Sequence, residues 1–479
     1  MAQEQSGKKD TSERSVSELY PLQRRDISFI ALSFAVVALA VVLPTPAGLT
    51  HEGQVMLGIL AMAVILWITT PIPIAVTALL VMIMQPLLDV MPAVDVFHAF
   101  GNEAVFFLIG AFVLASAIER HGLHRRIALR FLRAFRQSPR MFTFGIMVSS
   151  ALLSFIMPEH GVVALFLPIV TSILIAMRVV PGQSNFGRVS MLCIAYGCSI
   201  GSLGTPIGGA RNPLTISVLA NAGIKISFFE WMSYSTPVVF IALPIVWLIL
   251  HFTFPLEVDD IADARKKIDD RVQEMGAMGR PEMTVAAILA VTVGLWMFAS
   301  QELGLAVIAL LGGALLFFTG TISWEDVEKR VPWGVVLLYG GAITLGMSLK
   351  ETGAAQWIVD LIIGTGSEPY IILLALIVLT IAITNFISNT AAVAMLLPIG
   401  LAIASEIPDI SPLLSSMTIA LSGGLAFMLV IATPGNAITY SAGYFSTRDL
   451  LKGGTIANLV CIGVVFAVAV VYWKGFLGL

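Results

Sequence analysis

Charged residues are scarce in this sequence. Only 12% of the 479 residues are Asp, Glu, Lys or Arg, and 57% are hydrophobic, whereas about 25% of a soluble domain is charged. The mean hydropathy is +0.92. Because so few charged residues cannot cover a water-facing surface, most of the chain must face lipid or other helices. This composition excludes a large soluble domain, and the net charge of −3 gives no reason to expect a nucleic-acid partner.

Cysteine and histidine are also rare, with three and six residues. The cysteines lie inside apolar stretches, which favours a packing role over a disulfide or metal framework. The dipeptide Glu159-His160 belongs to no HExxH motif and has no second histidine at helical spacing, so an intramembrane enzyme is not expected. The first 26 residues are polar, and the following apolar run is long enough to remain as a span, which argues against a cleaved signal peptide.

The apolar runs predict an all-α polytopic membrane protein. Each membrane-spanning helix needs roughly 20 apolar residues, and the runs suggest about eleven transmembrane helices. Two further stretches, 142–177 and 370–404, are too long for one span and are broken by short polar clusters. This pattern is typical of re-entrant hairpins, whose tips must be buried in protein. The apolar stretches 190–220 and 417–442 are interrupted and are expected to be broken helices.

The basic residues predict the orientation of the chain. With the N-terminus in the cytoplasm, the cytoplasmic segments hold 23 of the 27 Lys and Arg residues, as the positive-inside rule requires. Seven arginines alternate with apolar residues in 120–140, which predicts an amphipathic helix on the inner surface. Arg211 belongs to neither side and is expected at mid-membrane. We therefore expect an integral protein of a bacterial-type inner (plasma) membrane with a cytoplasmic N-terminus.

The two halves of the chain share motifs at a nearly constant offset. Leu167-Pro168-Ile169 matches Leu397-Pro398-Ile399, and Gly204-Thr205-Pro206 matches Ala432-Thr433-Pro434. Five crossings per unit would give the units opposite orientations, and such inverted repeats are a transporter signature. The expected segments are a cytoplasmic tail (1–26), a first transmembrane helix (27–54), a first repeat (55–254), a cytoplasmic linker (255–282) and a second repeat (283–479).

The second half carries a specific resemblance. Ser388-Asn389-Thr390, Leu396-Leu397-Pro398 and the run from Ala432 to Ala437 resemble the motifs of the divalent anion:sodium symporter family, which includes dicarboxylate and citrate transporters. The resemblance extends over nearly the whole chain after Leu43. It implies a homodimer and an elevator-type transporter, with a scaffold made by the early spans of each repeat. The mobile transport domain would contain both hairpins and both broken helices and hold a carboxylate between two sodium ions.

Polar residues at the hairpin tips and helix breaks form the predicted site. Freed backbone N–H groups and helix N-termini attract carboxylates. The predicted substrate-binding residues are Glu159, His160, Thr205, Arg211, Asn212, Ser388, Asn389, Thr390, Thr433, Pro434 and Asn436. The family's second sodium site implies Thr384, Ser388, Asn389 and the Ala432 carbonyl as ligands for Na⁺. No catalytic residue and no other cofactor are expected.

The first repeat departs from the family pattern. Pro158-Glu159-His160 stands where Ser-Asn-Thr is expected, and Arg211 stands where a proline is usual. Ionisable residues at membrane depth are costly and are functional candidates by default. Glu159 and Arg211 could pair and be architectural. Alternatively, Arg211 or protonated His160 supplies the positive charge that sodium provides elsewhere, and a guanidinium suits a carboxylate or sulfonate. The first sodium is then lost, and a Glu-His dyad also permits proton coupling.

These features predict a secondary active transporter of small organic anions. C4-dicarboxylates or related di- and tricarboxylates are the first candidates, with coupling to sodium or exchange of anions. The alternative is a proton-coupled or sodium-independent transporter of sulfonate or sulfate. An anion channel is a more distant alternative, because a channel does not need two anion-shaped half sites. An intramembrane enzyme is equally distant, because no HExxH motif or second histidine at helical spacing accompanies Glu159-His160. The expected partners are the anion, membrane lipid and a second copy of the chain.

Overall fold

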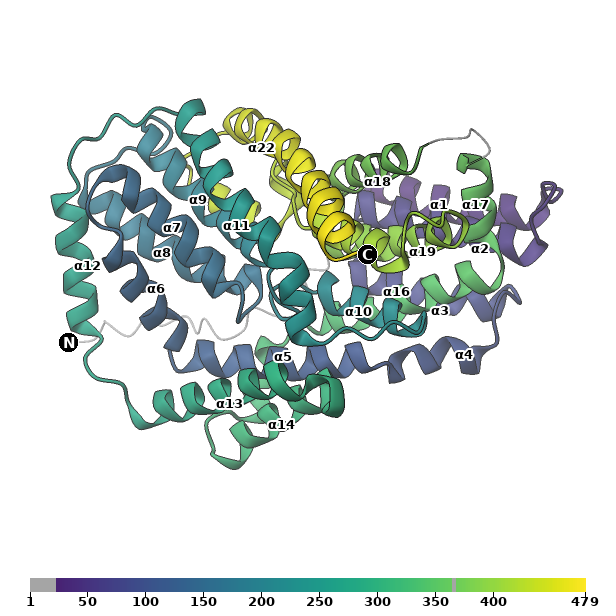
Figure 1. Cartoon of the computed structure of the whole chain (residues 1–479), viewed down its shortest axis with the longest axis horizontal. Coiled ribbons are helices and arrows are strands. Elements are labelled where there is room, and N and C mark those ends of the chain that lie inside the picture. Colours follow the sequence, from purple (N-terminus) through teal and green to yellow (C-terminus); the bar gives the residue numbers. More distant parts are fainter. Residues whose placement is uncertain (1–22, 364–367) are drawn as a thin grey trace, which may run out of the picture.

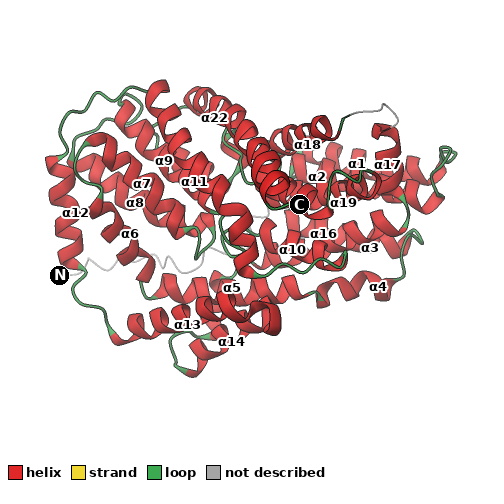
Figure 2. Cartoon of the chain, in the orientation of Figure 1, coloured by secondary structure: helices red, strands yellow, loops and turns green. Residues whose placement is uncertain are grey.

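The fold is described from a computed structural model, which covers residues 23–363 and 368–479. Within these residues every regular element is a helix and no strand occurs, so the all-α prediction is confirmed (Figure 2). Most of the predicted cytoplasmic tail, residues 1–22, lies outside the described part.

The helices of the first half include a short 3₁₀ turn at Ala99–Gly101. They are α1 (Arg24–Val42), α2 (His51–Thr69), α3 (Ile74–Leu87), α4 (Ala93–His98), α5 (Glu103–Arg120), α6 (Leu123–Ala134), α7 (Pro139–Leu153), α8 (Glu159–Ala176), α9 (Asn185–Gly201), α10 (Arg211–Asn221) and α11 (Phe228–Thr253).

The second half includes a 3₁₀ turn at Val430–Ala432 and ends in a π-helical segment, Val468–Phe476. Its helices are α12 (Ala262–Glu274), α13 (Arg280–Leu303), α14 (Leu305–Phe318), α15 (Trp324–Arg330), α16 (Trp333–Glu351), α17 (Ala354–Ile363), α18 (Pro369–Thr384), α19 (Asn389–Glu406), α20 (Pro412–Ser422), α21 (Pro434–Tyr440) and α22 (Thr447–Ala467).

The order of elements from α2 to α11 parallels the order from α13 to α22. The contacts are reciprocal as well: α5 packs on α14 as α16 packs on α3, and α8 packs on α21 as α19 packs on α10. Figure 1 shows α7, α8, α9 and α11 together at one end of the molecule and α2, α3, α16 and α19 at the other. The two halves are therefore interleaved, because helices of the first half pack directly on helices of the second half.

Nine helices in the described part of the chain are long and apolar enough to cross a membrane. Two of the expected spans, α3 and α14, are shorter apolar helices of 14 residues each. Helix α1 packs on α2 along one side but has only two buried residues, Ser33 and Val37, so much of its apolar surface is left for lipid or another chain. The protein is a polytopic membrane protein.

The segments expected to be hairpins each contain a pair of helices. α7 and α8 are separated by residues 154–158, and α18 and α19 by residues 385–388. Pro158 occupies the N-cap of α8, where its missing N–H loses no helical bond. Ser388 caps α19 by accepting a hydrogen bond from the Ala391 N–H at 3.3 Å. Both tips thus end in a residue suited to starting a helix.

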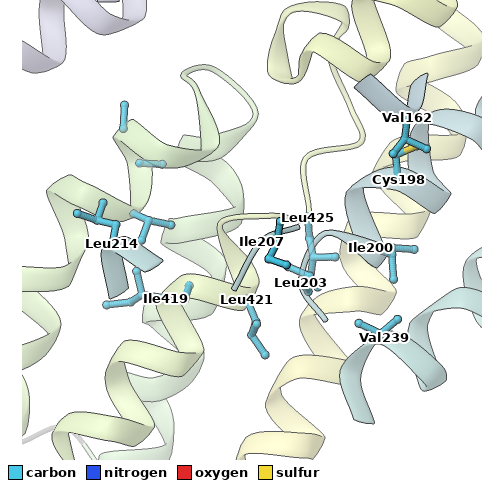
Figure 3. Close-up of a cluster of buried hydrophobic side chains, with 14 of the residues drawn as sticks. Val162, Cys198, Ile200, Leu203, Ile207, Leu214, Val239, Ile419, Leu421 and Leu425 are labelled. Atoms are coloured by element: carbon cyan, nitrogen blue, oxygen red, sulfur yellow. The ribbon is translucent and has the colours of Figure 1, made fainter. Parts of the chain in front are cut away.

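The broken helices meet over an apolar layer. The α9–α10 loop contributes Leu203 and Ile207, and the chain after α20 contributes Leu425, which lies beside them in Figure 3. Leu203 and Leu425 are fully buried and Ile207 is 7% exposed. Apolar packing fixes the loops that carry the polar site residues.

The predicted cytoplasmic linker 255–282 contains α12, which packs on α6 and α8. Arg126 of α6 is buried and forms two hydrogen bonds to the Glu282 carboxylate, 2.5 and 2.9 Å long, and a third to the Gly276 carbonyl. The arginine-rich segment 120–140 is thus only partly a surface helix, because its buried face is tied to this linker.

Candidate substrate site

A cavity of about 420 Å³ lies where the two helix pairs and the two helix breaks converge. We call it the central cavity. Pro158, Glu159 and His160 line it from the first tip, and Ser388, Asn389 and Thr390 line it from the second. Pro206 to Arg211 line it from one break, and Ala432 and Pro434 from the other. Residues of α3, α5 and α16 complete the wall.

Seven of the eleven predicted substrate residues line this cavity. They are Glu159, His160, Arg211, Ser388, Asn389, Thr390 and Pro434. Three helices of more than two turns, α8, α10 and α19, begin at the cavity wall with Glu159, Arg211 and Asn389. Their N-terminal N–H groups and helix dipoles make the cavity favourable for a negatively charged ligand.

The other four predicted residues lie behind the wall. The Thr205 hydroxyl donates to the Phe155 carbonyl at 2.7 Å, and the Asn212 amide donates to the Ser202 and Thr205 carbonyls. Thr433 caps α21, and the Asn436 amide donates to the Ala426 and Leu429 carbonyls. These contacts shape the loops around the central cavity, and their role in binding stays a prediction.

Arg211 brings a buried guanidinium to the cavity wall. Its side chain is only 2% exposed, and Nη2 donates to the Ser202 hydroxyl at 2.7 Å. Nε is buried without a hydrogen-bond partner. Because a guanidinium stays charged in proteins, this end of the cavity carries a fixed positive charge.

Glu159 and Arg211 do not form a direct ion pair in the described structure. Ser202 lies between them: its hydroxyl is 3.4 Å from Glu159 Oε2 and 2.7 Å from the Ser199 carbonyl. With one hydrogen, that hydroxyl donates to only one of these acceptors at a time. The Ser202 hydroxyl thus bridges the two charged side chains, and both remain at the cavity wall.

The second tip carries a cluster of oxygen atoms. The Thr384 hydroxyl lies 2.9 Å from Asn389 Oδ1 and 2.8 Å from the Gly423 carbonyl oxygen. Asn389 Nδ2 is buried without a partner. Of the predicted sodium ligands, the structure brings Thr384 and Asn389 together, while the Ser388 hydroxyl caps α19 and Ala432 lines the same cavity.

Sequence reasoning missed three contributors to this site. Ser202 follows the last residue of α9, and nothing in the sequence around it distinguishes it from the other small residues there. Gly423 provides a main-chain carbonyl, which no side-chain motif marks. Gly424 was missed because its role depends on a contact with Arg211, more than 200 residues away.

Gly424 makes room for the Arg211 guanidinium. A Cβ atom at this position would overlap Nη2 of Arg211 and would meet Leu203 Cδ2 at 2.5 Å. Gly424→Ala should therefore displace the guanidinium, at an overpacking cost of about 1–3 kcal/mol. Because the displaced guanidinium would no longer meet the anion in the right geometry, we also expect anion affinity to fall, roughly five- to 150-fold, in a binding titration of the purified protein.

Gly294→Ala is the matched control for this substitution. A Cβ atom at Gly294, within α13, would meet nothing within 4 Å, so affinity and thermal stability should be unchanged or slightly higher. Wild-type affinity in Gly424→Ala would show that the guanidinium position is unimportant for the site.

The family-model comparison decides the family. Residues 25–479 match the model described as the sodium:sulfate symporter transmembrane region. The chain belongs to this family. The resemblance stated for the second-half motifs is thereby confirmed, and this family member is a membrane transporter and not an enzyme.

Curated relatives of this symporter-family chain agree. It is 31% identical to the sodium-dependent dicarboxylate transporter SdcS of Staphylococcus saprophyticus, over 98% of this chain and 93% of the relative. It is also 31% identical to SdcS of Staphylococcus aureus strain RF122, over 89% of this chain and 87% of the relative.

Two solved structures share the fold. The YdaH transporter of Alcanivorax borkumensis aligns with a TM-score of 0.58 at 14% identity, covering 94% of this chain and 98% of that chain. MtrF of Neisseria gonorrhoeae, described among antimetabolite efflux pumps, aligns with a TM-score of 0.58 at 11% identity and covers 94% of both chains. At these identities the likeness concerns the fold alone.

Proposed function

We propose that this protein is a secondary active transporter of C4-dicarboxylates and related small organic anions. The central cavity carries the proposal, because it combines the buried Arg211 guanidinium, the unpaired Asn389 amide donor and helix N-termini within about 420 Å³. The SdcS relatives are sodium-dependent dicarboxylate transporters, which supports the same substrate class.

A dicarboxylate needs a positive or donor group for each of its two ends. Arg211 offers a fixed charge on the first-repeat side, where its planar fork matches a carboxylate. On the second-repeat side, Asn389 Nδ2 is a buried donor without a partner, and satisfying it would stabilise the bound anion. Glu159 repels negative charge close to its carboxylate. Its position beside Ser202 therefore influences which anions the cavity accepts.

A single sodium ion fits the second-repeat side. Hard cations of this kind take oxygen ligands. Thr384, Asn389 and the Gly423 carbonyl present three oxygen atoms from different segments, which would hold Na⁺ as a co-transported ion. On the first-repeat side, Arg211 takes the role of the other cation. One sodium per cycle, or exchange of anions, follows from this asymmetry.

We further propose that transport follows an elevator mechanism built on an inverted repeat. α7 to α10 and α18 to α21 pack on one another and would move together, whereas α5 with α14 and α3 with α16 would form the scaffold. The cavity wall draws residues from both groups, so relative movement would change its access. The exposed apolar α1, the positive-inside charge pattern and the family resemblance support a lipid-embedded homodimer with a cytoplasmic N-terminus.

Uptake by purified protein in proteoliposomes tests this function. Labelled succinate and sulfate are compared, with sodium or potassium outside and with or without internal succinate. We expect saturable succinate uptake that internal succinate accelerates. Uptake should rise hyperbolically with sodium concentration, because the proposal includes one sodium site.

Three outcomes would contradict the proposal. Sulfate uptake without succinate uptake would favour the inorganic-anion alternative. A sigmoidal sodium dependence would mean that a second sodium binds despite Arg211. Uptake that never saturates and shows no counter-transport would indicate a channel.

A further inference from the structure

A second cavity, of about 660 Å³, opens beside the first tip. α5, α6, α12 and α15 form one side of it, and α8 and α21 form the other. Figure 1 shows α6, α8 and α12 together at one end of the molecule. The charged and titratable residues of these helices that line it, besides His160, are Glu119, His124, Arg125, Arg271 and Arg330, and we call it the basic vestibule.

Positive charge is in excess in the basic vestibule. Arg330 lies 3.8 Å from Glu119 and 3.9 Å from Asp326, and Arg271 lies 4.0 Å from Glu274. These pairs are longer than ordinary charge-assisted hydrogen bonds of about 2.7–2.9 Å. Arg125 has no ion pair or hydrogen bond with any residue in the described ranges. Its guanidinium is therefore available to an anionic ligand.

His124 adds an adjustable group. Its Nδ1 lies 3.1 Å from the Ile118 carbonyl oxygen, which can only accept, so Nδ1 carries the hydrogen. The other ring nitrogen, Nε2, is left for a ligand or a proton. Burial and the charges of Arg125 and Arg330 lower the pKa of His124, and an anion bound nearby would offset that repulsion.

The corresponding place in the other half provides an internal comparison. α16, α17, α19 and α10 form a crevice of about 400 Å³ there, and Pro398 lines it as Pro168 lines the basic vestibule. Lys350 is the single charged residue among the lining of that crevice. The fold thus forms a crevice at both places but needs no cluster of arginines to do so.

The basic vestibule adjoins the substrate site. His160 lines both the basic vestibule and the central cavity. The positive-inside pattern predicts that this side is cytoplasmic. An anion that left the central cavity toward it would pass the three arginines that line the basic vestibule.

We propose that the basic vestibule is a second, weaker binding site for the transported dicarboxylate, loaded from the cytoplasmic face. The inference rests on the proposed function. The vestibule concentrates the anion at the mouth of the central cavity and so lowers the cytoplasmic KM, without contributing to binding from the opposite face. The effect should fall with ionic strength, because the Debye length shrinks from about 30 Å at 0.01 M to about 3 Å at 1 M salt.

Transport by the Arg125→Gln variant, measured separately from each face of the membrane, tests the proposal. Succinate KM is measured in right-side-out and inside-out vesicles, at low and high ionic strength. We expect Arg125→Gln to raise KM at the cytoplasmic face roughly fivefold, a loss of about 1 kcal/mol, at low salt only. KM at the other face and the maximal rate should be unchanged.

Arg130→Gln is the matched control, because Arg130 lies on the same helix, is exposed and does not line the cavity. It should leave both KM values unchanged. Equal effects of the two variants would overturn the proposal in favour of a general role in membrane topology. No effect of Arg125→Gln, or an equal effect at both faces, would also overturn it. A wild type that transports succinate at neither face would instead reject the proposed function.

Discussion

Arg211→Ala should remove most of the protein's affinity for its anion. The substitution removes the fixed positive charge of the central cavity. The negative charge of Glu159 at the cavity wall then has no nearby arginine to balance it. Losing a hydrogen bond to a charged group costs about 1.5–3 kcal/mol, and repulsion from Glu159 adds to that loss. Affinity should therefore fall by roughly 150-fold or more, which isothermal titration of the purified protein with succinate would measure.

Two companion variants separate charge from folding. Arg211→Lys retains the charge but loses the planar fork, so binding should be weakened but measurable. Glu159→Gln should retain anion binding. It should slow the return of the empty carrier, because the Arg211 guanidinium would then be a buried charge with no carboxylate near it, which is costly. Exchange should then survive better than net uptake. Normal succinate affinity in a folded Arg211→Ala protein would refute the assignment of Arg211 to the site.

Asn389→Ala should weaken uptake severely while leaving the protein folded. It removes the buried Nδ2 donor and the Oδ1 partner of Thr384 in one step. The loss of a buried polar contact costs on the order of 1–3 kcal/mol, or roughly five- to 150-fold in succinate affinity. Sodium activation should shift to higher concentration in the same uptake assay, because Oδ1 belongs to the oxygen cluster.

Asn221→Ala is the control for this substitution, since Asn221 is exposed at the end of α10 and does not line the central cavity. Asn389→Asp offers a sharper comparison: it keeps an oxygen beside Thr384 but replaces the donor by a negative charge. It should lose succinate affinity at least as strongly as the alanine variant. Wild-type kinetics in Asn389→Ala would reject the second-tip site.

Much of the site was predictable because its signals are local. Polar clusters that interrupt apolar runs lie near both helix-pair tips, and the repeated Thr-Pro motif lies at both breaks. Seven predicted residues accordingly line the central cavity. The motif could not distinguish a ligand from a loop support, because Thr205 and Thr433 have the same polar groups in either role.

The remaining features depend on contacts between distant segments. The Ser202 bridge, the space that Gly424 leaves for Arg211 and the Arg126–Glu282 pair each join residues whose relation is set by packing. Periodicity reports only which face of one helix is apolar. The arginines of α6 were accordingly predicted to lie on a surface, and the contacts with α12 could not be foreseen.

The most direct test is the position of the bound anion. An electron cryomicroscopy map of the protein with succinate and sodium should show the anion in the central cavity, between Arg211 and Asn389. A sodium ion should lie beside Thr384, and none should lie at the first tip. An anion bound outside the central cavity, or a sodium ion coordinated at the tip that carries Glu159, would contradict the account.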